Sequence, residues 1–271
     1  MKVSFYCTRW GQERMPWDTF FRRVRESGYD GVETVLPLTP AEQEPILNGL
    51  EKYGLKLIGQ HWDTVTADFT VHAMELEQRL RSMLHAGAVL ITSHTGRDFF
   101  SFEQNIQLLL ISKRIAQENK VAIIHETHRG KFSFAAHITQ RYLEAIPSLR
   151  LNLDISHWYT VAESYLEDQV QAIQLAVERT AHVHARVGHA QGSQVSDPRG
   201  REWDQVLHQH LMQWDRVVEQ HCQLGSTDLG FTCEFGPSPY MQTFPGTDKP
   251  LSDQWEVNAF MKDLLKDRYD K

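Results

Sequence analysis

Residues 180–187 read Thr-Ala-His-Val-His-Ala-Arg-Val, a short β-rich run in which apolar and polar side chains alternate. Successive side chains of a strand point to opposite faces. One face of this predicted strand carries Val183, Ala185 and Val187, and the other carries His182, His184 and Arg186. Three cationic or titratable groups on a buried face need partners, because burial of an unpaired charge is costly. The stretch therefore predicts a strand that packs against helices on one side and faces a polar site on the other.

Similar β-rich runs alternate with longer amphipathic runs along the whole chain. The predicted strands are 2–7, 31–36, 55–62, 88–94, 121–127, 149–157, 180–187 and 229–235. The predicted helices are 16–27, 40–53, 70–86, 102–118, 134–145, 163–178, 202–223 and 252–267. Alternating strands and helices indicate parallel pairing, and eight such units predict a closed (β/α)8 TIM barrel. The 271 residues fit one domain, 1–271, since such barrels have about 250 residues.

Local signals agree with these boundaries. Gly28 and Gly54 follow the first two predicted helices, where a left-handed cap is favoured, and Pro40 suits the first turn of the second helix. The segment 188–201 is rich in Gly, Ser and Pro and is interpreted as a long loop after the seventh strand. A doubly wound open sheet is the alternative fold, but the glycine-rich signature of its nucleotide-binding versions is missing from the sequence.

Composition restricts the function further. The net charge of −7 and a pI near 6.0 argue against a protein that grips nucleic-acid backbones. The three cysteines match no zinc-finger spacing, and we expect reduced thiols. We find no signal peptide and no apolar run of the length that spans a membrane. These features predict a cytoplasmic protein with a small-molecule partner, no nucleic acid and no membrane.

The same alternation, applied to the last four strands, brings an acid or a histidine inward at the end of each. These residues are Glu126, Asp154, His184 and Glu234. Three carboxylates and an imidazole that converge at one end of a barrel need a cation, and active sites of this fold lie at that end. The oxygen-rich set favours one divalent ion, with Mn²⁺ or Mg²⁺ ahead of Co²⁺ or Zn²⁺.

This ordered set resembles the xylose-isomerase-like TIM-barrel superfamily, which includes ketose 3-epimerases, hydroxypyruvate isomerase, inosose dehydratase and the endonuclease IV type of DNA repair enzyme. The resemblance covers nearly the whole chain. It implies that Glu126, Asp154, His184 and Glu234 bind the metal, and that Glu126 and Glu234 also serve as the catalytic acid and base. It further implies a carbohydrate-like substrate, an enediolate intermediate and a homo-oligomer.

Substrate contacts follow partly from the resemblance and partly from position. The resemblance implies that His157 and Arg186 contact the substrate. We expect other substrate-binding side chains at strand ends or beside them, namely His61, His94, His128 and Trp158. Glu33 could line the pocket or form an ion pair with a neighbouring strand, and Trp10 and Trp62 could supply apolar walls.

The chain also departs from the family that it resembles. The endonuclease branch requires an Asp-x-His pair after the seventh strand, but here Arg199 follows Asp197 at the histidine position. Arg199, Arg201 and the basic turn 127–131 could contact a phosphate or carboxylate on the substrate. The sequence therefore favours a sugar or polyol isomerase or epimerase. A metal-dependent phosphodiesterase or abasic-site endonuclease, a dehydratase and a non-catalytic binding barrel remain alternatives.

Overall fold

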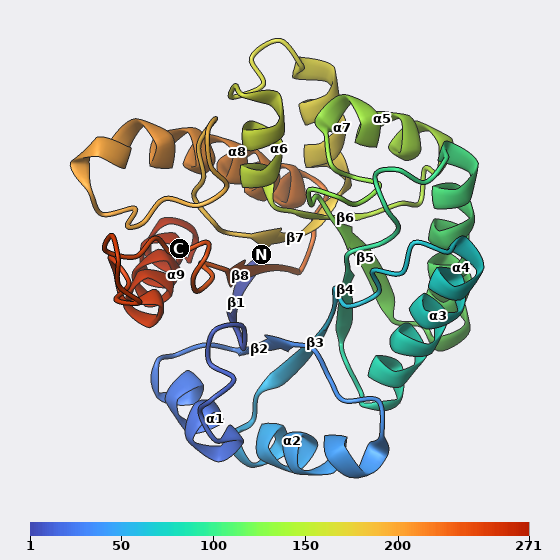
Figure 1. Cartoon of the computed structure of the whole chain (residues 1–271), viewed down its shortest axis with the longest axis horizontal. Helices are drawn as coiled ribbons and strands as arrows, with labels where there is room; N and C mark the ends of the chain where they lie inside the picture. Colours follow the sequence, from blue (N-terminus) through green and yellow to red (C-terminus); the bar gives the residue numbers. More distant parts are fainter. Residues whose placement is uncertain (271) are drawn as a thin grey trace.

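The computed structural model describes residues 1–270, and its strands form one closed parallel barrel in sequence order. The barrel closes where β1 pairs with β8, so that Lys2 lies beside Asp228 and Cys7 beside Cys233. Figure 1 looks down this barrel, with the helices arranged around the strands. The predicted TIM barrel is thereby confirmed. The strands are β1 (Lys2–Thr8), β2 (Gly31–Thr34), β3 (Lys56–His61), β4 (Leu90–Ser93), β5 (Ala122–Glu126), β6 (Leu151–Leu153), β7 (Thr180–His184) and β8 (Asp228–Cys233).

In residues 1–270, all α-helices except α6 overlap a predicted amphipathic run. They are α1 (Trp17–Glu26), α2 (Pro40–Tyr53), α3 (Phe69–His85), α4 (Phe102–Asn119), α5 (Ala136–Ala145), α6 (Ile155–Ala162), α7 (Val170–Arg179), α8 (Asp204–Gln223) and α9 (Gln254–Tyr269), with the short 3-10 turn η1 (Arg201–Trp203). Gly54 caps α2 in the left-handed conformation, at φ 61°, as predicted. Pro40 is the first residue of that helix. None of the helices in residues 1–270 is both long and apolar enough to cross a membrane.

The sixth predicted strand, 149–157, was too long. The structure ends β6 at Leu153 and begins α6 at Ile155, because the Asp154 carboxylate accepts a hydrogen bond from Ser156 N, at 3.0 Å. This contact caps the first turn of a helix. The helix predicted at 163–178 correspondingly begins later, at Val170. His157 therefore lies on a helix rather than on a strand.

Apolar side chains fill the layer between the strands and the helices, and the predicted alternation in β7 and β8 holds there. Val183, Ala185, Phe231 and Cys233 all belong to this core and are buried. The inside of the barrel is more polar than expected. The buried polar side chains on the barrel strands, outside this apolar core, include Ser4, Glu33, Thr92, Asn152, His182 and Thr232.

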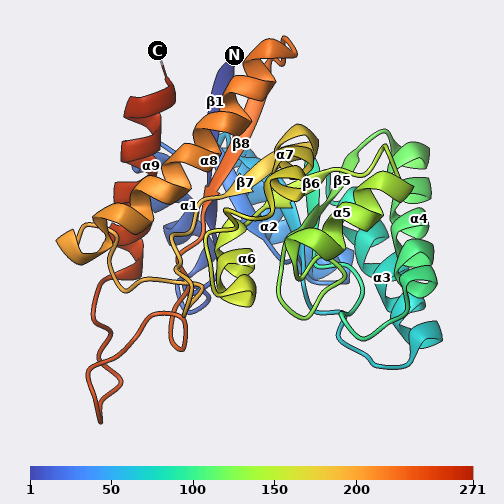
Figure 2. The same cartoon turned by 90° about the horizontal axis from the view of Figure 1, so that it is seen from above.

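The long connections lie at the C-terminal ends of the strands. Figure 2 shows both termini on one side of the barrel, while the segment between β8 and α9 extends on the opposite side. The predicted loop 188–201 is confirmed as part of the irregular connection between β7 and η1. Loops at this end of a TIM barrel surround the active site.

Candidate metal centre and substrate cavity

The four residues singled out by alternation converge in space. Glu126 ends β5, Asp154 follows β6, His184 ends β7 and Glu234 follows β8. One potential ligand atom from each lies within 4.8 Å of the others. Each residue is at most 4% exposed. Such close packing of three carboxylates away from water requires compensating positive charge.

His184 supplies part of that charge. Its Nδ1 lies 2.9 Å from Glu234 Oε2 and 3.2 Å from Glu126 Oε2. Burial lowers the pKa of His184, but the charges of Glu234, Glu33 and Glu126 outweigh it and hold the pKa well above its usual value. His184 Nδ1 nevertheless forms no hydrogen bond with the described residues, and neither does Glu126 Oε1.

These unpartnered atoms make the site suitable for a cation. Once a cation displaces the Nδ1 proton of His184, a nitrogen lone pair and several carboxylate oxygens would face one small volume, and this donor set is rich in oxygen. Hard divalent ions such as Mn²⁺ and Mg²⁺ prefer such ligands. The residues present therefore fit the divalent ion that the sequence predicts.

Glu33 contacts His184 from inside the barrel. The sequence alone left open whether Glu33 lines the pocket or forms an ion pair with a neighbouring strand. Both of its carboxylate oxygens lie 3.0 Å from His184 Nε2. Thr92 and Thr232 donate their hydroxyls to the same carboxylate. Burial raises the pKa of Glu33, but its contacts with His184 and His182 outweigh that effect and lower it below its usual value. Glu33 thus keeps a negative charge behind His184, on the side away from Glu126 and Glu234.

Asp154 is neutralised by Arg186. The guanidinium of Arg186 forms an ion pair with Asp154 Oδ2, and both side chains are almost fully buried. Arg186 Nη2 also lies 2.6 Å from His157 Nε2, and the Tyr240 ring lies 4.8 Å from its guanidinium. Arg186 is therefore fixed beside the candidate metal centre by contacts on several sides.

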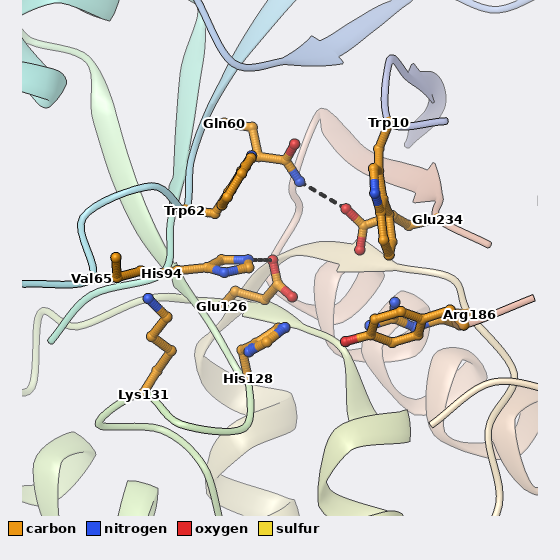
Figure 3. Close-up of a pocket in the computed structure, with 11 residues that line it drawn as sticks. Trp10, Gln60, Trp62, Val65, His94, Glu126, His128, Lys131, Arg186 and Glu234 are labelled. Atoms are coloured by element: carbon orange, nitrogen blue, oxygen red, sulfur yellow. Dashed lines mark hydrogen bonds and ion pairs between the residues drawn. The ribbon is translucent and has the colours of Figure 1, made fainter. Parts of the chain in front are cut away.

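A cavity of about 320 Å³ opens next to this centre. Figure 3 shows Glu126 and Glu234 facing it from different sides, with a hydrogen bond from His94 to Glu126 and another from Gln60 to Glu234. The two hydrogen bonds are both 2.7 Å long. The cavity is lined by Trp10, Gln60, Trp62, Val65, His94, Glu126, His128, Lys131, Arg186, Glu234 and Tyr240. Its size is in the range of small-molecule sites.

The structure brings some of the predicted substrate-binding residues to this cavity and not others. His94, His128 and Arg186 line it. His61 lies outside it, fully buried, with its ring nitrogens within 2.8 Å of the Ser93 and Thr64 hydroxyls. Trp158 is also fully buried away from it and donates its indole N–H to Ser133 O.

His157 contacts a cavity residue without lining the cavity itself. It is fully buried and does not line the cavity, but its ring nitrogens face the guanidinium groups of Arg186 and Arg129. It can therefore affect the cavity through Arg186. The predicted anion contact by Arg199 is not supported, because Arg199 forms a two-point ion pair with Asp197 on an exposed loop. Neither Arg199 nor Arg201 lines the cavity.

Among the cavity residues, Gln60, Val65 and Tyr240 were not predicted, and Lys131 was included only within the basic turn 127–131. Gln60 reaches Glu234 from β3, where His61 had been expected to point inward. Lys131 reaches the cavity from the turn after β5. The basic composition of that turn was the signal for Lys131, whereas strand 55–62 gave no clear signal for Gln60, because both of its faces carry apolar and polar residues.

His210 on α8 fixes the loop that follows Arg186. Its Nδ1 donates to Val206 O at 2.9 Å, and its Nε2 accepts from Gly188 N at 3.3 Å, an arrangement that requires a neutral ring. Burial lowers the pKa of His210 to about 4.

We expect the His210 site to weaken the fold in acid. The unfolded chain binds this proton near pH 6.5 and the folded chain only near pH 4, so the free energy of unfolding falls as the pH drops between these values. Relative to His210→Gln, the wild type should lose about 2–3 kcal/mol between pH 7 and pH 4.5 in urea denaturation. The exposed His208→Gln variant is the control on the same helix, and an equal loss in all three proteins would contradict the assignment.

Comparisons with known proteins agree with the geometry. Residues 21–243 match the family model described as xylose isomerase-like TIM barrel. No match was found among curated proteins. Among solved structures, the chain is similar to the 3-keto-D-glucoside 4-epimerase YcjR from E. coli, with a TM-score of 0.64, 13% identity and coverage of 98% of this chain and 100% of that one.

Two further structures show the range of activities on this fold. One is described as the probable 3-DHS dehydratase AsbF from Bacillus anthracis, with a TM-score of 0.61, 16% identity and coverage of 97% and 99% of the two chains. The other is endonuclease IV from Thermus thermophilus, with a TM-score of 0.58, 13% identity and coverage of 98% and 100%. At such identities the similarity establishes the fold alone.

Proposed function

Because this chain belongs to the xylose isomerase-like TIM-barrel family, we propose that it is a divalent-metal-dependent isomerase or epimerase of a sugar or polyol-like substrate. The observation that carries the proposal is the convergence of Glu126, Asp154, His184 and Glu234 within 4.8 Å beside a cavity that two of them line. A metal centre and a pair of carboxylates facing one small-molecule cavity are what carbon acid chemistry requires.

The four residues would hold the ion, with Mn²⁺ as our first choice, and its charge would polarise the substrate carbonyl and stabilise negative charge on oxygen. Glu126 or Glu234 then removes a proton from the carbon next to the carbonyl. The other residue, which must hold a proton at this stage, delivers that proton to the opposite face of the carbon, or to the neighbouring position, and is left as a carboxylate. His94 and Gln60 orient these carboxylates through the hydrogen bonds described above. Return to the opposite face gives an epimer, and transfer between neighbouring positions gives an isomer.

The remaining cavity residues would bind and enclose the substrate. Arg186 keeps its charge through Asp154 and can stabilise substrate oxygens, while His128 offers a further polar contact. Trp10 and Trp62 provide flat apolar walls against the carbon face of a sugar ring. Enclosure on several sides would keep bulk water from the carbanion.

The decisive test combines metal analysis with isotope exchange. Purified protein is loaded with Mn²⁺, its metal content is measured by plasma mass spectrometry, and a panel of ketoses and aldoses is incubated with it in D₂O. We expect about one ion per chain and metal-dependent deuterium incorporation next to a carbonyl, observed by NMR. Glu234→Gln should lose the ion, whereas Asp215→Asn, which breaks a surface pair with Arg268, should keep it. Failure of the wild type to bind any metal would refute the proposal.

A metal-dependent phosphodiesterase is the second candidate, because the structure contains a further group of potential ligands. His94, Glu126 and His128 each offer one ligand atom within 4.8 Å of the others, so a second cation could share Glu126. Pairs of ions that share a carboxylate suit phosphoryl chemistry. Two tightly bound ions per chain together with cleavage of abasic-site DNA would favour this candidate over the first. A dehydration product in the sugar assay would instead indicate a lyase with the same proton-abstracting residues.

A further inference from the structure

Lys131 is the cavity residue that the proposed chemistry does not use. Its side chain lines the cavity, and the residue is 6% exposed. Figure 3 shows its ammonium directed into the cavity beside His94 and Val65. Within residues 1–270, the Nζ atom has neither a hydrogen-bond acceptor nor an ion-pair partner. A buried ammonium without a partner is unfavourable unless a ligand supplies one.

The turn that carries Lys131 is held in place. Lys131 N donates to His128 O at 3.3 Å, and Phe134 N donates to Lys131 O at 3.1 Å. The next residue, Phe132, donates its N–H to Thr95 O after β4, at 3.3 Å. The side chain thus projects from an ordered backbone that is joined to the strand end at Glu126 by only a few residues.

The charges around the cavity leave Lys131 unbalanced. The metal centre contributes three carboxylates, from Glu126, Asp154 and Glu234, which a divalent ion and Arg186 together neutralise. Lys131 then adds one positive charge that no carboxylate pairs with directly, although the more distant charges of Glu126, Asp63 and Asp98 favour it. Burial lowers the pKa of Lys131 to about 8, with Arg97 acting in the same direction, so most of the population is still charged at neutral pH.

The other cation of the same turn is already engaged. Arg129 donates to Ser193 Oγ at 3.0 Å, contacts His157 Nδ1 at 3.0 Å and does not line the cavity. The cavity wall therefore offers a single free ammonium. A phosphate dianion, with three acceptor oxygens, is normally bound by several donors, whereas one lysine matches one carboxylate.

We propose that Lys131 binds a carboxylate group of the substrate, and that the enzyme acts on sugar acids rather than on neutral or phosphorylated sugars. This inference rests on the proposed function, since it places the substrate in the same cavity. With its carboxylate at Lys131, the substrate extends across the cavity toward Glu126 and Glu234. Lys131 is thus a specificity-determining residue that selects and orients the substrate.

The test compares acids with neutral partners in which a hydroxymethyl group replaces the carboxylate. D-glucuronate is paired with D-glucose, D-galacturonate with D-galactose and D-glycerate with glycerol, and D-glucose 6-phosphate is added as the phosphorylated probe. Binding to the Mn²⁺-loaded protein is followed by intrinsic tryptophan fluorescence, because Trp10 and Trp62 line the cavity, and by thermal stability. The variants are Lys131→Met, Lys131→Arg and, as a matched control, Lys113→Met on the exposed face of α4.

We expect at least one acid to bind the wild type about tenfold or more tightly than its neutral partner. This preference should disappear in Lys131→Met, persist in Lys113→Met and be partly retained in Lys131→Arg. The inference is overturned if no acid exceeds its neutral partner, if the preference survives in Lys131→Met, or if the phosphorylated sugar binds best. Acid-selective binding that depends on Lys131, without proton exchange, would contradict the proposed function but support this site. Proton exchange on neutral sugars that is undiminished in Lys131→Met would support the proposed function but contradict this inference.

Discussion

Replacing Glu126 or Glu234 with glutamine is expected to lower turnover at least about a thousandfold, measured on whichever sugar exchanges deuterium in the Mn²⁺-loaded wild type. Glutamine has nearly the same shape as glutamate, and its carbonyl can still accept the hydrogen bond from His94 or from Gln60. What it lacks is the negative charge and the ability to take up a proton. Both the metal centre and the proton transfer depend on these properties.

The fold should tolerate either change. Both carboxylates lie close to His184 Nδ1, so their negative charges repel each other. Removal of one charge reduces this repulsion. We therefore expect the circular dichroism spectrum of each variant to match the wild type and the melting temperature to change by only a few degrees. Glu44→Gln, an exposed change on α2, is the matched control and should keep full turnover. Substantial turnover in either active-site variant would exclude its carboxylate as the acid or base.

Much of this site could be predicted from the sequence because β7 and β8 are strictly patterned. In these strands every second side chain is apolar and packs on the helices, so the positions of His184 and Glu234 follow from counting. Asp154 was also placed correctly, although the chain turns into a helix directly after it. Alternation could not predict that turn, because an aspartate two residues before a serine fits a strand end and a helix cap equally well.

The residues that were missed depend on contacts between distant parts of the chain. Strand 55–62 has no clean alternation, so its register was ambiguous, and only the contact with Glu234 shows that Gln60 points inward. Lys131 was included only as part of the basic turn 127–131, because side-chain direction in a turn depends on the path of the backbone rather than on periodicity. Glu33 could be interpreted only after His184 was found behind it, 151 positions along the chain.

Glu33→Gln is expected to weaken divalent-metal binding about ten- to a hundredfold without any change in the four proposed ligands. With the metal on His184 Nδ1, the proton of the ring remains on Nε2, where both Glu33 oxygens lie at 3.0 Å. The negative carboxylate fixes this tautomer and makes the imidazole a better electron donor. The neutral amide of glutamine retains at most the hydrogen bond to His184 Nε2, and it lacks the negative charge of the Glu33 carboxylate.

Metal affinity, measured by competition with a chelator, tests this effect independently of any substrate. Glu75→Gln, which alters a partly buried hydrogen bond with Thr66, should leave the affinity unchanged. Thr232→Ser retains the hydroxyl donor to Glu33 and should bind metal nearly as tightly as the wild type, whereas Thr232→Val should lie between the wild type and Glu33→Gln. Unchanged affinity in Glu33→Gln would mean that His184 does not ligate the metal through Nδ1. The polar interior of the barrel would then require an explanation other than support of the metal centre.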